Sequence, residues 1–177
     1  MAWKRAIPWV VLFVAVALFA LDRLVPGGGG PSGEATGAGG RAASLVTRVV
    51  DGDTVHVRIG GSDERVRYIG VDTPETVKPG TPVQCFGKAA SAYNHRLVDG
   101  QPVRLRFDAE QHDRYGRLLA YVYRARDGLF VNAALVRGGY ATTLTIPPNT
   151  AHATQFAALE RRARDRQRGL WRACPAG

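Results

Sequence analysis

Cysteine is rare in this 177-residue chain, which contains two, Cys85 and Cys174. Two cysteines are too few for a miniature fold built on several disulfides, or for a zinc site made of four thiolates. Lysine is also rare, because Lys4, Lys78 and Lys88 are its three lysines and arginine supplies the other basic residues. No internal repeat is present, so the sequence does not predict a repeat architecture.

The chain is basic, with 24 lysines and arginines against 15 aspartates and glutamates, a net charge of +9 and a pI near 10.2. Such a charge favours a polyanionic partner, either nucleic acid or anionic lipid, without specifying a fold. Hydrophobic residues make up 45% of the chain, which is enough for a packed core and excludes a wholly disordered protein. The length predicts one domain with appendages.

Residues 1–25 contain an uncharged run at 6–21 that follows Lys4 and Arg5. As a helix, this run of sixteen residues would measure about 24 Å, less than the thickness of a typical hydrocarbon core. We interpret residues 1–25 either as an uncleaved membrane anchor in a thinned bilayer or as a cleaved signal peptide, with a buried core helix as the third alternative. The first two interpretations place the remaining chain outside the cytoplasm, as a single-pass membrane protein or as a secreted protein.

Residues 26–43 are rich in glycine, with eight glycines among the fifteen residues 26–40. Such a segment cannot bury enough apolar surface to offset the entropy lost on ordering, so we expect a flexible linker. Residues 44–177 carry a net charge of +7 and form the predicted globular domain.

The hydrophobic pattern of residues 44–177 alternates in some segments and has a helical period in others. Three strands come first, followed by a helix, two more strands and two more helices. This order favours a mainly β protein with helices (α+β): a five-stranded oligonucleotide-binding barrel with about three helices, preceded by the N-terminal hydrophobic helix. Strands are predicted at 45–50, 54–59, 65–71, 102–107 and 118–123, helices at 89–98, 130–136 and 151–168, and a turn at 60–63.

An acidic segment ends the third predicted strand, where Asp72 and Glu75 lie within three residues of each other. Thr73 precedes Pro74, which favours an extended backbone and could direct the Thr73 carbonyl towards a cation. Two carboxylates and a main-chain oxygen are ligands that a hard cation such as Ca²⁺ prefers. A solvated acidic loop is the alternative. Arg67 lies within the strand itself, where a charged residue requires an explanation.

Further charged clusters accompany other predicted elements. Asp51 and Asp53 flank a glycine between the first two strands, and an ordinary hairpin turn is the alternative to a functional site. Arg117 follows the turn residue Asp113 at the start of the fifth strand, where a surface ion pair is the alternative. The arginines of the helix at 151–168 are interpreted as a solvated face that could add to the attraction of polyanions.

Together these clusters match the requirements of phosphodiester cleavage. A cation polarises a phosphoryl oxygen, cationic side chains stabilise the transition state, and a base deprotonates or orients water. Arginine suits phosphate better than lysine because its planar fork makes two-point contacts. The residues that could supply these groups are Asp53, Asp72, Arg67, Glu75 and Arg117.

These motifs resemble those of the thermonuclease family, the staphylococcal-nuclease-like calcium-dependent nucleases. The resemblance extends over about residues 45–171, most of the predicted domain. It rests on Asp-Gly-Asp-Thr at 51–54, Arg67 with Val-Asp-Thr-Pro-Glu at 71–75, the segments 113–121 and 131–136, and Gly-Leu-Trp at 169–171.

The resemblance implies an oligonucleotide-binding barrel that hydrolyses DNA and RNA with Ca²⁺ and releases 3′-phosphorylated products. It implies that Asp53 and Asp72 are carboxylate ligands of the ion and that Thr73 contributes its main-chain oxygen. Asp51 would lie behind these ligands as a supporting carboxylate. We expect the enzyme to be a monomer.

The resemblance also assigns the residues that act on the substrate. Glu75 would hold the attacking water, either as a general base or by orienting it. Arg67 and Arg117 would bind the scissile phosphate, and Arg114 and Tyr115 would contact the nucleic acid.

The sequence departs from the family after the second predicted helix, where the family often has tyrosines that contact the nucleotide. Thr145 and Pro147 stand near those positions in this chain. Because stacking on an aromatic ring is worth ~1–3 kcal/mol per base, we expect weaker nucleotide binding or a greater dependence on Tyr115.

Cys85 precedes the first predicted helix and Cys174 follows the last. In an exported chain this placement favours a disulfide between them, and two thiols are the alternative. A nucleophilic cysteine is disfavoured because neither cysteine neighbours a histidine in the sequence.

A catalytically inactive barrel that binds nucleic acid while tethered outside the cell is the alternative function. Such a module would be expected to lack Arg67, Glu75 or Arg117, and this chain retains all three. A histidine-based nuclease is disfavoured because the four histidines are scattered and form no paired motif. These are His56, His95, His112 and His152.

Overall fold

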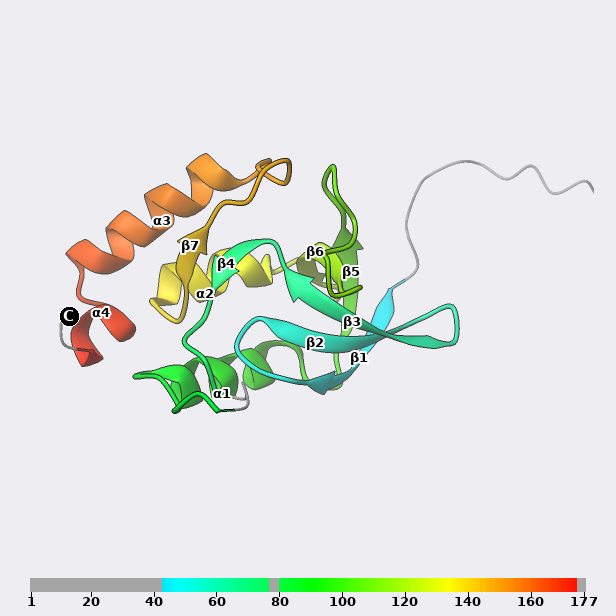
Figure 1. The fold of residues 1–177 in the computed structure, drawn as a ribbon, viewed down its shortest axis with the longest axis horizontal. Helices are drawn as coiled ribbons and strands as arrows, with labels where there is room; N and C mark the ends of the chain where they lie inside the picture. The colour runs from blue at the N-terminus through cyan, green and yellow to red at the C-terminus, as the bar shows by residue number, and fades with distance from the viewer. Residues whose placement is uncertain (1–42, 77–79, 175–177) are drawn as a thin grey trace, which may run out of the picture. The chain divides into compact units, whose positions relative to one another are not determined.

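The structure is a computed structural model that describes residues 43–76 and 80–174, which belong to one compact unit (Figure 1). The segment predicted as an anchor or signal peptide at 1–25 lies outside the described residues, as does the predicted linker apart from Ala43. Among the helices of the described part, none combines the length and hydrophobicity that crossing a bilayer requires.

Five strands close into a barrel, as the sequence predicts. Neighbouring strands are antiparallel except for one parallel pair, and the antiparallel pairing of the first strand with the last strand in barrel order closes the barrel. The strands, in barrel order, are β1 (Ser44–Val49), β2 (Thr54–Ile59), β3 (Ser62–Tyr68), β6 (Leu118–Arg124) and β5 (Pro102–Arg106).

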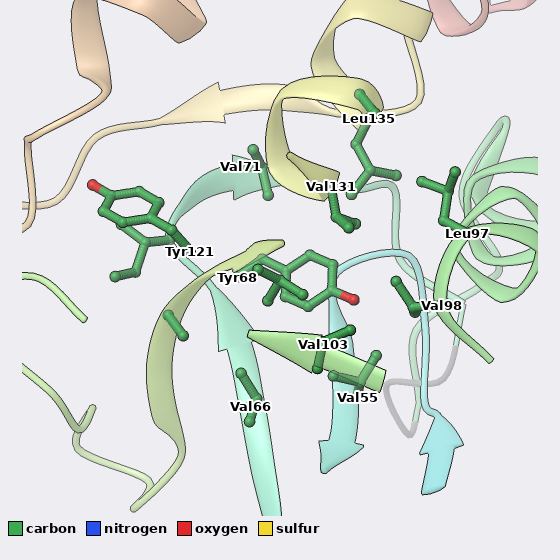
Figure 2. Close-up of a cluster of buried hydrophobic side chains, with 14 of the residues drawn as sticks. Val55, Val66, Tyr68, Val71, Leu97, Val98, Val103, Tyr121, Val131 and Leu135 are labelled. Carbon is green, nitrogen blue, oxygen red and sulfur yellow. The ribbon is translucent and has the colours of Figure 1, made fainter. Parts of the chain in front are cut away.

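The barrel interior is filled by the inward-facing residues of these strands, because alternate side chains of a strand point to opposite faces. Val55, Val66 and Val103 are fully buried there, and Tyr68 is 2% exposed. Figure 2 shows these side chains in one cluster with residues of the helices, so that barrel and helices share a single core.

Within the described residues, four helices accompany the barrel. The first begins two residues before the predicted helix at 89–98, and the third is shorter than the predicted helix at 151–168. The second ends at Gly138 and is capped by Gly139, which has a φ of 72°, a conformation that glycine adopts without strain. The helices are α1 (Gly87–Val98), α2 (Val131–Gly138), α3 (Ala153–Asp165) and the single-turn α4 (Leu170–Ala173).

The strand predicted at 65–71 is wrong as a single element, because it breaks at Ile69. Its second part, β4 (Gly70–Asp72), leaves the barrel and pairs with β7 (Thr142–Leu144), a strand that the sequence analysis missed. Gly70 makes the break with a φ of 79°, and a Cβ atom there would lie 2.5 Å from the Phe156 ring. The bend carries Asp72 out of the barrel wall towards the loops.

Smaller differences occur at the strand ends. Ser62 and Asp63 belong to β3 rather than to the predicted turn at 60–63, and β5 ends at Arg106, one residue before the predicted end. The elements β7 and α4, of three and four residues, are too short to show a hydrophobic period.

A disulfide joins Cys85 and Cys174, as the sequence analysis expects, across a sequence separation of 89 residues. It ties the segment before α1 to the end of α4. Closing so long a loop removes much conformational freedom from the unfolded chain.

Replacing both cysteines, Cys85→Ser with Cys174→Ser, should lower the free energy of unfolding by about 4 kcal/mol in the chain-entropy account. Urea denaturation of the oxidised wild type and of the double variant measures the difference. Reduced wild-type protein serves as the control and should unfold like the variant; equal midpoints for the oxidised protein and the variant would contradict the expectation.

Candidate active site

A cavity of about 300 Å³ lies where three loops meet at one end of the barrel strands. The β1–β2 turn, the segment after β4 and the loop before β6 all contribute to it. The cavity gathers every residue that the sequence analysis assigned to catalysis or to the metal. It is lined by Asp51, Asp53, Thr54, Arg67, Asp72, Thr73, Pro74, Glu75, Tyr115 and Arg117.

Asp53 is the most deeply buried acid of the cavity, with 4% of its surface exposed. Its Oδ2 atom accepts hydrogen bonds of 2.8 Å from both the main-chain N and the Oγ1 of Thr73, and lies 3.0 Å from the Arg67 guanidinium. This carboxylate therefore binds together the turn, strand β3 and the segment after β4.

Arg67 extends along the break between β3 and β4. Its Nη1 atom donates to the carbonyl of Val71 at 2.9 Å, and its Nη2 atom donates to Asp72 Oδ1 at the same distance. The guanidinium thus lies between Asp53 and Asp72, the two predicted carboxylate ligands. This pairing explains how a charged residue is accommodated inside a strand.

Asp51 lies at the back of the cavity. Burial first, and then the adjacent charge of Asp53, raise the pKa of Asp51 to about 6, although the main-chain hydrogen bond from Asp53 and the charge of Arg67 act in the opposite direction. Its Oδ1 atom accepts a hydrogen bond of 3.0 Å from the main-chain N of Asp53. Asp51 therefore supports the turn that carries Asp53.

The backbone of Glu75 contacts the segment before α1. Its main-chain N donates to Gln84 Oε1 at 2.8 Å, and its carbonyl accepts from the main-chain N of Gln84 at 2.9 Å. The carboxylate accepts a hydrogen bond of 2.8 Å from the main-chain N of Thr76. These contacts fix where the Glu75 side chain enters the cavity.

Arg117 is fixed by an ion pair with Asp113, in which Nε donates to Oδ2 at 2.7 Å. Partial burial tends to raise the pKa of Asp113, but hydrogen bonds from the main chain and side chain of Arg117 and from the main chain of Tyr115 outweigh it, and the pKa is lowered. The carboxylate therefore stays ionised and holds the guanidinium at the cavity wall.

Tyr115 stands at the rim and is 67% exposed. The guanidinium carbons of Arg114 and Arg117 lie 4.8 and 5.5 Å from its ring centroid. Arg114 does not line the acidic cavity but lines a neighbouring one of about 440 Å³, which Tyr115 and Arg117 also border.

The neighbouring cavity has an aliphatic wall in the segment after α2, close in sequence to Thr145 and Pro147, where the resemblance implies tyrosines. Leu144 and Ile146 line it and are 38% and 58% exposed, whereas Thr145 and Pro147 do not line it. The positions of the sequence departure therefore lie next to this wall in the chain and do not form it.

The charges of the acidic cavity do not balance. Four carboxylates and two guanidinium groups line it, a formal excess of two negative charges. Within residues 43–76 and 80–174, however, no three acidic, histidine or cysteine side chains converge as a ready-made metal cluster. The oxygen donors that face a cation here would have to include main-chain oxygen.

Three residues that position the site were given no role by sequence reasoning, although Gly52 and Asn132 lie within the motifs quoted for the resemblance. Asn94 of α1 donates to the carbonyl of Asp51 at 2.9 Å and accepts from the Tyr68 hydroxyl at 3.1 Å. Asn132 of α2 donates to the carbonyl of Ile69 at 2.8 Å, at the break after β3. At Gly52, a Cβ atom would lie 2.6 Å from Thr73 Oγ1, so only glycine lets the two loops meet. The one available signal was the placement of asparagine at helix positions that face the core.

The fold and the cavity define a class of protein, a five-stranded barrel whose site combines carboxylates with guanidinium groups suited to a phosphate ester. Residues 65–173 match the family model described as Staphylococcal nuclease homologue. The chain is 42% identical over 161 residues to the thermonuclease of Staphylococcus intermedius, covering 91% of this chain and 95% of that relative.

Two other relatives show comparable similarity. The thermonuclease of Staphylococcus hyicus is 41% identical over 126 residues, which cover 71% of this chain and 73% of that protein. Endonuclease YncB of Bacillus subtilis (strain 168) is 42% identical over 126 residues, covering 70% and 59%. The chain belongs to the staphylococcal nuclease family, and it is a phosphodiester-hydrolysing nuclease.

Replacing Asn94 by leucine should lower the free energy of unfolding by about 1–3 kcal/mol, because it leaves the Asp51 carbonyl and the Tyr68 hydroxyl without their partner. Burial raises the pKa of Tyr68, so its hydroxyl remains a donor that needs an acceptor. Urea denaturation measures the change. Tyr68→Phe is the matched control and should cost less, since it removes one of the two hydrogen bonds; an Asn94→Leu protein as stable as wild type would contradict this role.

Proposed function

We propose that this protein is a calcium-dependent, sugar-non-specific nuclease that hydrolyses phosphodiester bonds of DNA and RNA to 3′-phosphorylated products. The observation that carries the proposal is the single cavity in which four carboxylates meet two guanidinium groups. An anionic substrate could not approach four carboxylates without a counter-charge, and the cavity's formal excess of two negative charges matches a divalent cation.

The donor chemistry of the cavity fits Ca²⁺. Asp53 and Asp72 would hold the ion through carboxylate oxygens and Thr73 through its main-chain oxygen, all of them hard ligands that this cation prefers. When bound, the ion supplies positive charge to a phosphoryl oxygen. Because Arg67 contacts both carboxylates, its guanidinium lies within reach of a phosphate held beside them.

Different side chains of the cavity bind the phosphate and activate the water. Arg67 and Arg117 bind the phosphate oxygens and stabilise the negative charge that develops on them as water attacks. Glu75 accepts a hydrogen bond from that water, either taking its proton or orienting it. As the oxygen of water bonds to phosphorus, the bond from phosphorus to the 5′ oxygen breaks, the 5′ oxygen leaves as a hydroxyl after taking a proton from solvent, and the phosphate stays on the 3′ side.

The nucleic acid is bound beside the cavity by the loop before β6. Tyr115 offers an exposed ring for stacking, and Arg114 supplies positive charge next to it. Because Leu144 and Ile146 give the neighbouring cavity an aliphatic wall, and Thr145 and Pro147 stand near the positions where the resemblance implies tyrosines, nucleotide binding depends more on this loop. Catalysis needs one copy of the chain, so a monomer suffices.

The disulfide supports a location outside the cytoplasm, since such bonds persist in oxidising compartments. Residues 1–25 would either anchor the enzyme in the cell membrane as a single span, with the nuclease domain outside, or be removed to release it. The linker at 26–43 would keep the domain clear of the membrane. N-terminal sequencing of the protein from cells distinguishes the two forms.

The substitutions Glu75→Gln and Arg117→Ala should each lower kcat by about 100-fold or more, because they remove the group that holds water and a group that stabilises the transition state. Release of acid-soluble nucleotides from DNA measures turnover, and circular dichroism checks the fold. Glu64→Gln and Arg126→Ala, which change the same residue types away from both cavities, are the controls and should keep wild-type activity. Wild-type turnover in either cavity variant would contradict the assigned roles.

Removal of calcium should abolish cleavage of both DNA and RNA, and its return should restore it, since the carboxylates then repel the substrate. Acid-soluble nucleotide release with Ca²⁺, with a chelator, and with Ca²⁺ added in excess of the chelator gives the comparison. Undiminished cleavage in the chelator would refute the calcium requirement. Tight binding without cleavage under every condition would instead support an inactive binding module.

A further inference from the structure

Gln84 makes a two-point contact with the backbone of Glu75. Its side-chain Oε1 accepts from the main-chain N of Glu75 at 2.8 Å, and its own main-chain N donates to the Glu75 carbonyl at 2.9 Å. Both polar groups of the Glu75 main chain are therefore bound by one residue nine positions further along the chain.

The start of α1 packs against the same peptide. A Cβ atom on Gly87 would lie 2.9 Å from the carbonyl oxygen of Glu75 and 3.0 Å from that of Pro74. The main-chain N of Gly87 also donates to the Gln84 carbonyl at 3.0 Å. Glu75 thus rests against a hydrogen-bonded turn, at 84–87, that leads directly into a helix.

The disulfide fixes this turn to the far end of the domain. Cys85 follows Gln84 directly, and its partner Cys174 ends α4. Helix α4 is itself held to the end of α2, because the main-chain N of Leu170 donates to the Gly139 carbonyl at 2.8 Å. The turn that contacts Glu75 is therefore joined to α4 by a covalent bond, and through α4 to the end of α2 by a hydrogen bond.

We propose that Gln84, kept in place by the Cys85–Cys174 disulfide, is a positioning residue for Glu75. Gln84 lines neither cavity, so it acts through Glu75 and not on the substrate. The Glu75 carboxylate is oriented by the main-chain N of Thr76, and a shift of the backbone there moves the carboxylate with it. This inference rests on the proposed function, because it takes Glu75 as the residue that holds the attacking water.

The Gln84 side chain contributes differently to the position of Glu75 and to the stability of the fold. Gln84 is exposed, and a hydrogen bond in contact with solvent contributes little to folding. A catalytic group displaced by about 1 Å can nevertheless lose about 100-fold in rate. Loss of the Gln84 side chain should accordingly affect turnover far more than stability.

Gln84→Ala should lower kcat by about 10-fold or more while KM changes by less than about 2-fold and the unfolding midpoint stays the same. Gln84→Glu, which retains an oxygen acceptor, should recover most of the rate. Gln155→Ala removes an exposed glutamine hydrogen bond of 2.9 Å on α3 and is the matched control, expected to behave as wild type. Full kcat in Gln84→Ala would overturn the proposal, as would equal losses in Gln84→Ala and Gln84→Glu.

A double-variant cycle shows whether Gln84 acts through Glu75. In the Glu75→Gln background, adding Gln84→Ala should reduce the residual rate by less than about 2-fold, because the group it positions is already gone. A further 10-fold loss would overturn the proposal. Wild-type activity of Glu75→Gln alone would instead refute the role of Glu75 in the proposed function, so that the two failures are distinct.

The disulfide is tested in the same assay with the Cys85→Ser and Cys174→Ser double variant, at a temperature where circular dichroism shows it folded. Its kcat should fall with KM nearly constant, and adding Gln84→Ala should cause little additional loss. An undiminished kcat in the folded double variant would remove the disulfide from the proposal.

Discussion

The buried ion pair between Asp53 and Arg67 is the constraint on which the site depends. Their side chains are 6% and 14% exposed, and their charged atoms lie 3.0 Å apart. A buried pair contributes little net stability, yet loss of either partner would leave the other as an uncompensated charge. Asp53 also binds Thr73 and Arg67 binds Asp72, so the pair sets the positions of both other predicted metal ligands.

The helices complete this arrangement by supplying amide side chains where the barrel backbone bends. Asn94 from α1 supports the turn that carries Asp51, and Asn132 from α2 supports the bend that directs β4 towards the cavity. Both asparagines are fully buried. A buried amide is tolerated because its hydrogen bonds are satisfied, and the same bonds make the loop geometry rigid.

The sequence was informative where local chemistry decides the structure. The strands of the barrel follow from alternation, and Asp53, Arg67 and Glu75 could be named because their motifs are contiguous. The break at Ile69 was missed although the adjacent apolar residues Tyr68 and Ile69 interrupt the alternation and Gly70 follows them, and β7 was too short to recognise. Gln84 and Asn94 could not be identified either, because each binds a main-chain group whose position is known only after folding.

The two arginines of the cavity come from segments that are far apart in the chain: Arg67 lies in β3, and Arg117 lies directly before β6. Strand β3 pairs in parallel with β6, with Val66 opposite Leu118 and Arg67 opposite Leu119, so Arg117 arrives at its place only through this pairing. The two guanidinium groups can therefore share the cavity only once the chain has been synthesised through β6, so this half of the site depends on a contact between distant parts of the sequence.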